Sequence, residues 1–509
     1  MSDSHRYSHH SLRSGLACAA LALALAGCAV GPDFVPPSPA APDDWTSWSS
    51  ADETLRLHGG VDAPLPPRWW QAFGDPVLDR LEQRAFAASP DLKTAALRFA
   101  QARVQRSTVA AQRGPEVDAA GSVNRQRQSE YSAGTRMIDA ISDDRDTLAK
   151  VLSEPFTLYQ AGFDASWELD LWGRVSRSIE AADADVSNQA ALLDLARLSL
   201  ASDVAGNYFE LRTTQRQIRL AREDIAALED RTQILAARAK GGAIDHLDLE
   251  QQRAELAAIK AQLPGLLAQE GASLNQIAVL LGERPGALRD ELSAQAVENR
   301  AALPDLALGL PSELALRRPD IRAAEARLHR SVANIGVARA DLYPSIRLGA
   351  QFGYESYVSG EFFDWGSRNW SIGPSLNLPL FDGGRRRSVV QLRELEQQEA
   401  AVNYQQTVLK AWQEIDDALS AYAAEQQQAA QLGQRVRSAG VAYSLAQARY
   451  EGGTVDFIAV LDSQRSFLQA RRDLAASVGR LNTRYVTINK AIGNVPREAG
   501  GQPGEAASM

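Results

Sequence analysis

The side chains best suited to chemistry in this sequence are two carboxylates on one short segment. Glu168 and Asp170 lie two residues apart within Trp167–Arg174, and in an extended strand that spacing places both on one face. Paired carboxylates catalyse glycoside hydrolysis in many enzymes. Here the two residues belong to an alternating polar face, which the lining of a water-filled pore explains fully. The sequence has no Gly-x-Ser-x-Gly elbow, phosphate loop or metal cluster, so we expect no enzyme.

A second reactive group is the thiol of Cys28, which closes an apolar run near the N-terminus. The run Leu16–Ala26 follows two arginines and is too short to span a bilayer as a helix. Residues 1–27 are therefore predicted to be a lipoprotein signal peptide, and Leu25–Cys28 resembles a bacterial lipobox. We expect Cys28 to carry N-palmitoyl and S-diacylglycerol groups, and Ala29 after it favours sorting to the outer membrane.

Composition argues against several other classes of protein. Cys18 lies in the signal peptide, so the mature chain keeps no thiol for a disulfide or a metal. The net charge of −9 argues against nucleic acid as a partner. No stretch approaches the ~20 apolar residues of a transmembrane helix, so a membrane crossing would require a β-barrel. Apart from the lipid we expect no cofactor and no metal.

The mature chain contains the same series of motifs twice, at about 69–313 and 314–495. For example, the sequence Ser89–Leu92 returns with two changes as Arg318–Ile321. A duplication of this length indicates a repeat architecture. The segments outside the copies have the composition of linkers or disordered ends: the lipidated tether 28–68 and the tail 496–509.

Each copy contains two segments in which apolar and polar residues alternate, as in half-buried strands. Phe163, Ala165 and Trp167 alternate with Asp164, Ser166 and Glu168. A soluble sandwich shows the same alternation, but here long helices flank the strands, which favours an apolar-out barrel wall. About eight strands are the practical minimum for a barrel, so the chain must oligomerise, with two, three or four copies permitted. The strands are expected at about 115–128, 157–172, 344–358 and 368–382.

Between the strand pairs the apolar spacing becomes helical. Val408, Trp412 and Ile415 step by four and three residues, the spacing of a coiled-coil seam. The longest segments would form helices of ~100 Å, and the shorter ones sum to ~95 Å when stacked end to end. Each copy is thus one long helix beside two short ones, and the helices are expected at about 90–113, 174–240, 243–282, 319–342, 385–450 and 455–492.

Two long helical hairpins are predicted to turn at 238–245 and 449–456. Each turn contains a glycine pair, which allows the positive φ that a tight turn between helices requires. Asp245 and Asp456 follow the glycines and are well placed to cap the next helix. Asp416, beside the apolar seam, is interpreted as part of a solvated helix face together with Asp417.

Several motifs in order resemble the outer-membrane efflux lipoproteins, which are TolC-type outer membrane factors. They include the nodulation-T-type lipoproteins of tripartite resistance-nodulation-division pumps. The resemblance covers essentially the whole mature chain. The motifs are Cys28–Phe34, Trp69–Trp70 with Phe73, Trp167–Arg174, Arg317–Arg322, Ile335–Ile346 and Phe381–Arg385.

The resemblance implies an α+β membrane protein that assembles as a homotrimer. Four strands per chain would contribute to a twelve-stranded outer-membrane β-barrel among outer-membrane lipids. Coiled-coil helices would form a periplasmic α-barrel, with a mixed equatorial belt near 283–316. The implied function is a passive duct in a Gram-negative cell. It would export drugs or other toxic small molecules received from an inner-membrane resistance-nodulation-division pump and a periplasmic membrane-fusion adaptor.

The resemblance also assigns roles to the hairpin tips. Tyr450, Asp462 and Asp248 match residues that close the periplasmic gate, although a solvated helix face explains the two aspartates equally well. Val455 stands where the family pattern has an arginine, and Ala459 replaces an aspartate, so another arginine is expected to complete the gate. The residues expected to dock the adaptor are Arg238, Gly241, Gly242, Arg449, Gly452 and Gly453.

Two other functions remain open at this point. The chain could be the outer-membrane duct of a type I protein secretion system, or a lipid-anchored periplasmic scaffold that does not conduct. The lipobox and the start Gly31–Phe34 favour small-molecule efflux. The sequence does not identify the exported substrate, the particular pump or the adaptor.

Overall fold

The computed structural model describes residues 29–38, 49–56, 65–132, 144–242, 244–293 and 317–496. The expected signal peptide, the lipidation site Cys28 and the tail from residue 497 lie outside these residues. The chain forms two compact units. The first, here the strand unit, comprises Met1–Pro36, Ala102–Val186 and Arg327–Ala400; the second, the tip unit, comprises Pro37–Gln101, Ser187–Ala326 and Ala401–Met509. Each unit therefore combines segments from both sequence copies.

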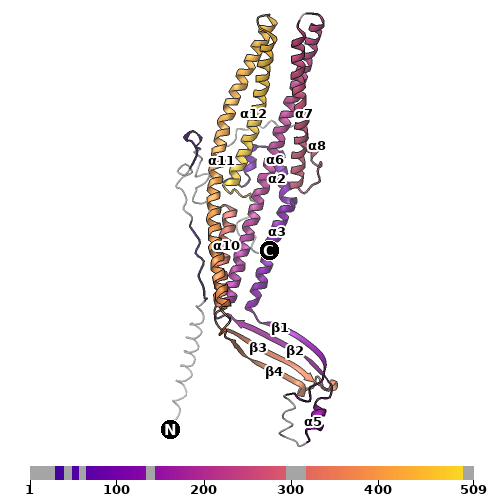
Figure 1. The fold of residues 1–509 in the computed structure, drawn as a ribbon, viewed down its shortest axis with the longest axis vertical. Helices are drawn as coiled ribbons and strands as arrows, with labels where there is room; N and C mark the ends of the chain where they lie inside the picture. Colours follow the sequence, from indigo (N-terminus) through magenta and orange to yellow (C-terminus); the bar gives the residue numbers. More distant parts are fainter. Residues whose placement is uncertain are drawn as a thin grey trace, which may run out of the picture. The chain divides into compact units, whose positions relative to one another are not determined.

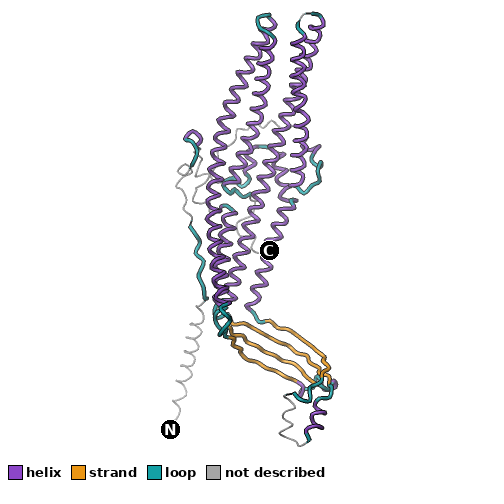
Figure 2. Tube along the Cα trace, viewed as in Figure 1, coloured by secondary structure: helices purple, strands orange, loops and turns teal. Residues whose placement is uncertain are grey.

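The strand unit contains one antiparallel sheet with the order β1-β2-β3-β4 (Figure 2). Two strands end earlier than expected. β2 ends before Asp170, whose carboxylate instead caps the following helix, and β4 ends before Pro379, which has no N–H for a ladder. The strands are β1 Glu116–Gln126, β2 Phe156–Leu169, β3 Ser345–Ser356 and β4 Arg368–Asn377.

The register places the apolar residues of all four strands on one face. Phe163 lies opposite Phe352, and Phe352 lies opposite Trp370. This face is uncovered, since Phe163 is 59% exposed and Ile372 is 75% exposed. Residues directly opposite one another share a face, so Glu168 and its partner Arg347 lie on the polar face. An uncovered apolar face of this extent requires a non-aqueous neighbour.

The segment between β1 and β2 contains a short helix that the sequence analysis did not anticipate. This helix, α5 (Arg145–Leu152), begins at Asp144, whose side chain accepts a hydrogen bond from the backbone N–H of Thr147. Eight residues are too few for the apolar periodicity that revealed the longer helices.

The long helices lie close to their expected ranges (Figure 1). α6 and α11 have 67 residues each, which corresponds to ~100 Å. Two shorter helices, α2 (Pro76–Ala88) and α8 (Arg289–Ser293), were not anticipated. None of the described helices is both long and apolar enough to cross a membrane. The long helices are α3 Pro90–Ala110, α6 Arg174–Lys240, α7 His246–Leu280, α10 Pro319–Ala340, α11 Arg385–Glu451 and α12 Phe457–Ala491.

The two strand-to-helix turns repeat one local device, an aspartate followed by glycine. Asp170 accepts hydrogen bonds from the backbone N–H groups of Val175 and Ser176 at 2.8 and 2.7 Å. At the start of α11, Asp382 accepts from the N–H groups of Gly384 and Arg386. Such caps satisfy backbone donors that have no partner within the helix, so the repeated motif has a local structural role.

The core of the tip unit is built around the family-like motif Trp69–Phe73. Trp69 is 0% exposed, and the Phe73 ring lies 4.4 Å from Phe209 and 5.2 Å from Tyr485 between centroids. The Tyr208 hydroxyl, in the same core, donates to Asp75, and burial raises the pKa of Tyr208. Aromatic packing of this kind joins α6 and α12 to the segment that precedes α2.

Segments near both chain ends also pack in the tip unit. The hydroxyl of Ser49 and the backbone N–H of Ser50 donate to Asp416 at 2.8 and 3.0 Å. Burial tends to raise the pKa of Asp416, but the hydrogen bonds from Ser50 and Ser49 outweigh it and lower the pKa. The interpretation of Asp416 as a solvated face was therefore wrong. At the other end, the side chain of Asn494 donates to the Pro66 carbonyl.

Candidate functional site at the hairpin tips

The helical hairpins α6–α7 and α11–α12 turn at the expected glycines. The second glycine of each pair has positive φ, 70° at Gly242 and 71° at Gly453, as the turn chemistry predicts. Asp245 caps α7 by accepting from the Leu247 N–H at 3.1 Å. Asp456 is the N-cap residue of α12, at the predicted position, but its side chain makes no capping hydrogen bond. Only its negative charge can favour this end of the helix.

The expected adaptor-docking residues all lie at these turns. Arg238 and Arg449 are exposed in the last turns of α6 and α11, where positive charge complements the helix dipole. The N–H groups of Gly241 and Gly452 continue the helical bonding to Ala237 and Ala448. Each tip thus carries an exposed arginine before its glycine pair, and the role of these residues in docking stays a prediction.

The two hairpins pack against each other through an apolar cluster, the tip cluster. It consists of Leu235, Ala239, Leu249, Phe457, Val460 and Leu461. The gate candidate Tyr450 is half-buried against this cluster, with its ring 5.3 Å from that of Phe457. Its ring therefore contributes to the packing between hairpins.

The two gate aspartates occupy different environments. Asp248 is half-buried, and burial together with the charges of Asp245 and Asp456 raises its pKa. Asp462 is exposed. Among the described residues, no hydrogen bond joins Asp248, Asp462 and Tyr450 within one protomer. Asp456 acts on Asp248 from the other hairpin, so like charges oppose one another where the hairpins meet.

An arginine that the sequence analysis did not name joins the hairpins behind the tip cluster. Arg231 of α6 donates from Nη1 to the Tyr443 hydroxyl of α11 at 2.9 Å and to Gln464 Oε1 of α12 at 3.3 Å. Its guanidinium also lies 5.8 Å from the centre of the Tyr443 ring and 5.9 Å from that of Phe457. Cation–π contacts of this type add to the hydrogen bonds, so Arg231 holds α6 to both helices of the second hairpin.

A second contact crosses between the hairpins at the same level. Arg465 Nε of α12 pairs with Glu255 Oε2 of α7 at 2.6 Å, and Glu255 is only 8% exposed. Gln252, one helical turn away, is 0% exposed, and neither atom of its side-chain amide has a hydrogen-bond partner among the described residues. Arg231, Gln464, Glu255 and Arg465 form a polar layer, here called the hairpin latch.

The sequence carried one signal that could have revealed the latch. Arg231 lies between Leu228 and Leu235, which are 0% and 3% exposed, and the spacing places all three on neighbouring parts of one helix face. A charged residue within an apolar seam is unusual and requires a partner. The sequence analysis expected another arginine to complete the gate but named none, and that expectation stays a prediction.

Farther from the tips, another ion pair crosses between the hairpins. Asp224 of α6 is 3% exposed and lies 3.2 Å from Arg471 and 3.6 Å from Arg472 of α12. Burial raises the pKa of Asp224, although the two arginines act in the opposite direction. Breaking such a buried pair is costly because it leaves a charge without compensation.

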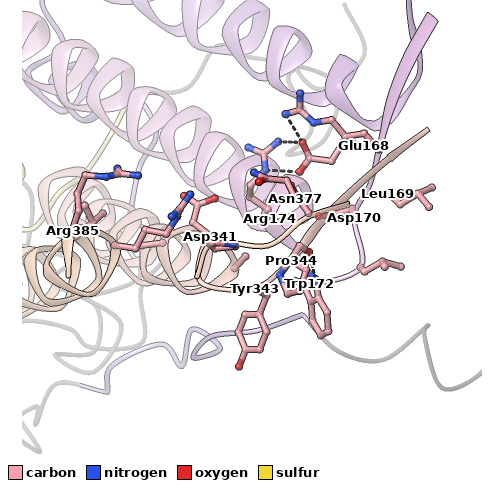
Figure 3. A pocket seen from close by; sticks show the side chains of 18 residues that line it. Glu168, Leu169, Asp170, Trp172, Arg174, Asp341, Tyr343, Pro344, Asn377 and Arg385 are labelled. Atoms are coloured by element: carbon pink, nitrogen blue, oxygen red, sulfur yellow. Dashed lines mark hydrogen bonds and ion pairs between the residues drawn. The ribbon is translucent and has the colours of Figure 1, made fainter. Parts of the chain in front are cut away.

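The strand unit contains a separate cavity where strands become helices (Figure 3). Its volume is about 290 Å³, and it is lined by Glu168, Asp170, Arg174, Arg347 and other residues. Glu168 accepts from Arg174 Nε at 2.7 Å and from Arg347 Nη2 at 3.2 Å, while Asp170 caps α6. Both carboxylates of the candidate catalytic pair are thus engaged in structural contacts.

The segment after Cys28 is docked on the strand unit, although it was expected to be an extended tether. Val30 N–H donates to the Trp172 carbonyl at 3.1 Å, and Asp33 pairs with Arg177. The Phe34 ring stacks on His329 with centroids 4.2 Å apart. The lipidation of Cys28 itself stays a prediction.

Among the described residues, no group of three His, Cys, Asp or Glu side chains could hold a metal ion.

The duplicated strand-and-hairpin architecture has a match among known protein families. The family model described as outer membrane efflux protein matches residues 81–283 and 310–494. The chain belongs to this family. The two matched stretches correspond to the two sequence copies, so the resemblance drawn from the motifs is confirmed.

Individual relatives cover most of the chain. The pyoverdine export outer membrane protein OpmQ of Pseudomonas putida is 33% identical over 84% of this chain and 87% of its own length. The outer membrane protein OprJ of Pseudomonas aeruginosa is 32% identical over 89% of this chain and 90% of its length. The solved structure of the outer-membrane channel OprN has a TM-score of 0.82 and 31% identity, covering 92% of this chain and 99% of that one. Family membership makes the chain an outer-membrane efflux component.

Proposed function

We propose that this chain is the passive outer-membrane duct of a tripartite pump for small molecules. The observation that carries the proposal is the four-stranded sheet of the efflux family, with one uncovered apolar face and one polar face. An apolar face suits lipid, and a polar face suits a water-filled lumen. OpmQ is named for pyoverdine export, and we propose a small-molecule cargo for this chain as well.

The two open edges of the sheet support assembly of several chains into a ring, and three is the number that the family resemblance implies. β1 and β4 are its two edge strands, and among the described residues neither has a partner on its outer side. In a ring of antiparallel strands, β4 of one chain would pair with β1 of the next, which removes both edges. Three chains would supply twelve strands, above the practical minimum for a barrel. The proposed trimer would receive cargo from an inner-membrane pump through a periplasmic adaptor at the hairpin tips.

The hairpin latch is proposed to hold the tips closed. Opening requires one hairpin to move away from the other, and this motion breaks the contacts of Arg231 with Tyr443 and Gln464. The repulsion between Asp248 and Asp456 acts in the opposite direction, since separation of the tips relieves it. The tips would therefore have a closed arrangement, held by the latch, and an open arrangement, favoured by the repulsion between the two aspartates. An adaptor that docks at the tips could shift the equilibrium between the two arrangements.

Two further parts of the proposal concern chemistry. The chain is proposed to catalyse no reaction, because Glu168 and Asp170 are engaged by arginines and by backbone donors. It is also proposed to carry a covalent lipid on Cys28. The described segment that follows this residue in sequence is anchored on the strand unit through Val30 and Asp33.

Conductance in planar bilayers and export in cells test the proposal together. Purified protein should form ion-conducting channels, and a deletion strain should become sensitive to compounds of a drug and solvent panel. Co-purification of a periplasmic adaptor is expected with the full chain. Absence of conductance together with unchanged tolerance would favour a non-conducting scaffold. Conductance with unchanged tolerance and loss of a secreted protein would favour the type I secretion duct.

A further inference from the structure

Two arginines interrupt the apolar face of the sheet at the end opposite the strand-to-helix turns. Arg125 is the next-to-last residue of β1, and Arg368 is the first residue of β4. Arg125 lies opposite Thr157, and Arg368 lies opposite Tyr354. Because strand side chains alternate with a period of two, Arg125 shares its face with Val123, and Arg368 shares its face with Trp370. Both arginines therefore lie on the apolar face, at its rim.

An aromatic group borders this rim and indicates where the apolar layer ends. The rings of Tyr354, Phe362 and Phe363 lie within 4.8 to 6.5 Å of one another between centroids. Trp370 is 68% exposed and lies opposite Phe352. Aromatic girdles mark the boundary between the acyl chains and the headgroups in outer-membrane proteins. The arginines lie ~7 Å beyond the nearest apolar residues of their strands, at the depth of the headgroups.

Among the described residues, no carboxylate forms an ion pair with Arg125 or Arg368. By contrast, Arg127 on the neighbouring turn pairs with Glu130 at 3.1 Å. Arg368 is held in place by its Nη1 bond to the Trp365 carbonyl at 2.7 Å and by stacking 3.8 Å from the Trp365 ring centre. A guanidinium that is oriented but has no anionic partner is suited to bind a phosphate.

We propose that Arg125 and Arg368 form a contact site for the phosphate groups of a phosphorylated lipid at the outer rim of the sheet. The site rests on the proposed function, because it requires the sheet to lie in the outer membrane. In the proposed ring, β4 of one chain adjoins β1 of the next, which brings Arg368 and Arg125 of neighbouring chains to the same end of adjacent strands. The pair would then bridge phosphates across the junction between chains.

Binding of purified full-length trimer to lipid A measures the proposed contact. The trimer in neutral detergent is titrated with lipid A that carries both phosphates, and separately with lipid A from which the phosphates have been removed. An arginine near an anionic lipid surface contributes a factor of about five in affinity. The Arg125→Gln/Arg368→Gln variant should therefore lose about fivefold for each arginine with the phosphorylated lipid, and should bind the dephosphorylated lipid like the wild type.

Two sets of variants provide controls. Arg216→Gln/Arg219→Gln removes the same charge from exposed positions of α6 in the tip unit, and it should bind both lipids like the wild type. Arg125→Lys/Arg368→Lys keeps the charge and should retain most of the preference. Equal binding of both lipids by the wild type, or an unchanged preference in the glutamine variant, would overturn the proposal. Channels that conduct in bilayers of dephosphorylated lipid while showing no preference would refute this site alone and leave the duct intact.

Discussion

Removing the guanidinium of Arg231 should weaken the contact between the two hairpins without unfolding either of them. The change Arg231→Met keeps much of the apolar stem, which packs near Phe457, and deletes the hydrogen bonds to Tyr443 and Gln464. Both partners lie more than 200 residues away in sequence, on the other hairpin. The lost contacts therefore affect the packing between hairpins far more than the local helix.

The size of the effect follows from the burial of the partners. Gln464 is 4% exposed, and an unsatisfied buried polar group costs about 1–3 kcal/mol. The lost cation–π contacts add about 0.5–1 kcal/mol. Separation of the hairpins lets water reach Gln464, so most of this cost falls on the closed arrangement. A change of about 2 kcal/mol shifts the ratio of closed to open tips by a factor of about 30.

Single-channel recording of reconstituted trimers measures this ratio directly. The Arg231→Met channels should show a higher open probability or a larger conductance than the wild type. Arg219→Met, an exposed arginine on the same helix, serves as the matched control and should conduct like the wild type. Unchanged gating of Arg231→Met in folded trimers would refute the assignment of the latch to Arg231.

Other parts of the structure give three further predictions. The pKa of Asp248 is raised in the folded chain by burial and by the charges of Asp245 and Asp456, so folding favours the protonated carboxyl more than the unfolded chain does. The free energy of unfolding should therefore fall as pH rises through that pKa, and Asp248→Asn should reduce this pH dependence in denaturant titrations. Glu168→Ala leaves Arg174 and Arg347 without their shared carboxylate and should destabilise the strand unit by about 1–3 kcal/mol in thermal melts, whereas the exposed Glu116→Ala should not. Asp118 lies opposite Asp164 on the polar face, so Asp118→Asn/Asp164→Asn should lower the preference of the pore for cations, and an unchanged reversal potential in a salt gradient would argue against a lumen on this face.

Local sequence was sufficient to predict the long elements. α6 occupies Arg174–Lys240, the range expected from its spacing and its turn residues, because a long periodic segment repeats its signal many times. The aspartate and glycine before α6 and α11 form caps with residues only a few positions away, so these caps can also be predicted from local sequence. By contrast, α5 has only eight residues, too few turns for a periodic signal. α2 was also missed, although its buried residues Leu78, Leu81 and Ala85 have helical spacing.

The candidate site was predictable only in part, because only some of its features depend on residues close together in the sequence. The positions of the two turns and the positive φ of Gly242 and Gly453 follow from local chemistry. The partners of Arg231 and Asp416 come from distant parts of the chain, and no local pattern identifies which side chain will face them. Asp456 shows the limit even for local motifs, because it occupies a capping position without making the cap.

The sequence by itself therefore determined the duplication, the alternating strands, the lengths of the helices and the family of this protein, since each depends on repeated short-range patterns. Only the tertiary structure decided which charged residues are buried between the hairpins and which lie at the rim of the apolar face. Those outcomes depend on which segments pack together and on which side chains then lose water. Arg231 and Arg125 are the same residue type in helix and strand, and only their surroundings distinguish a latch from a lipid contact.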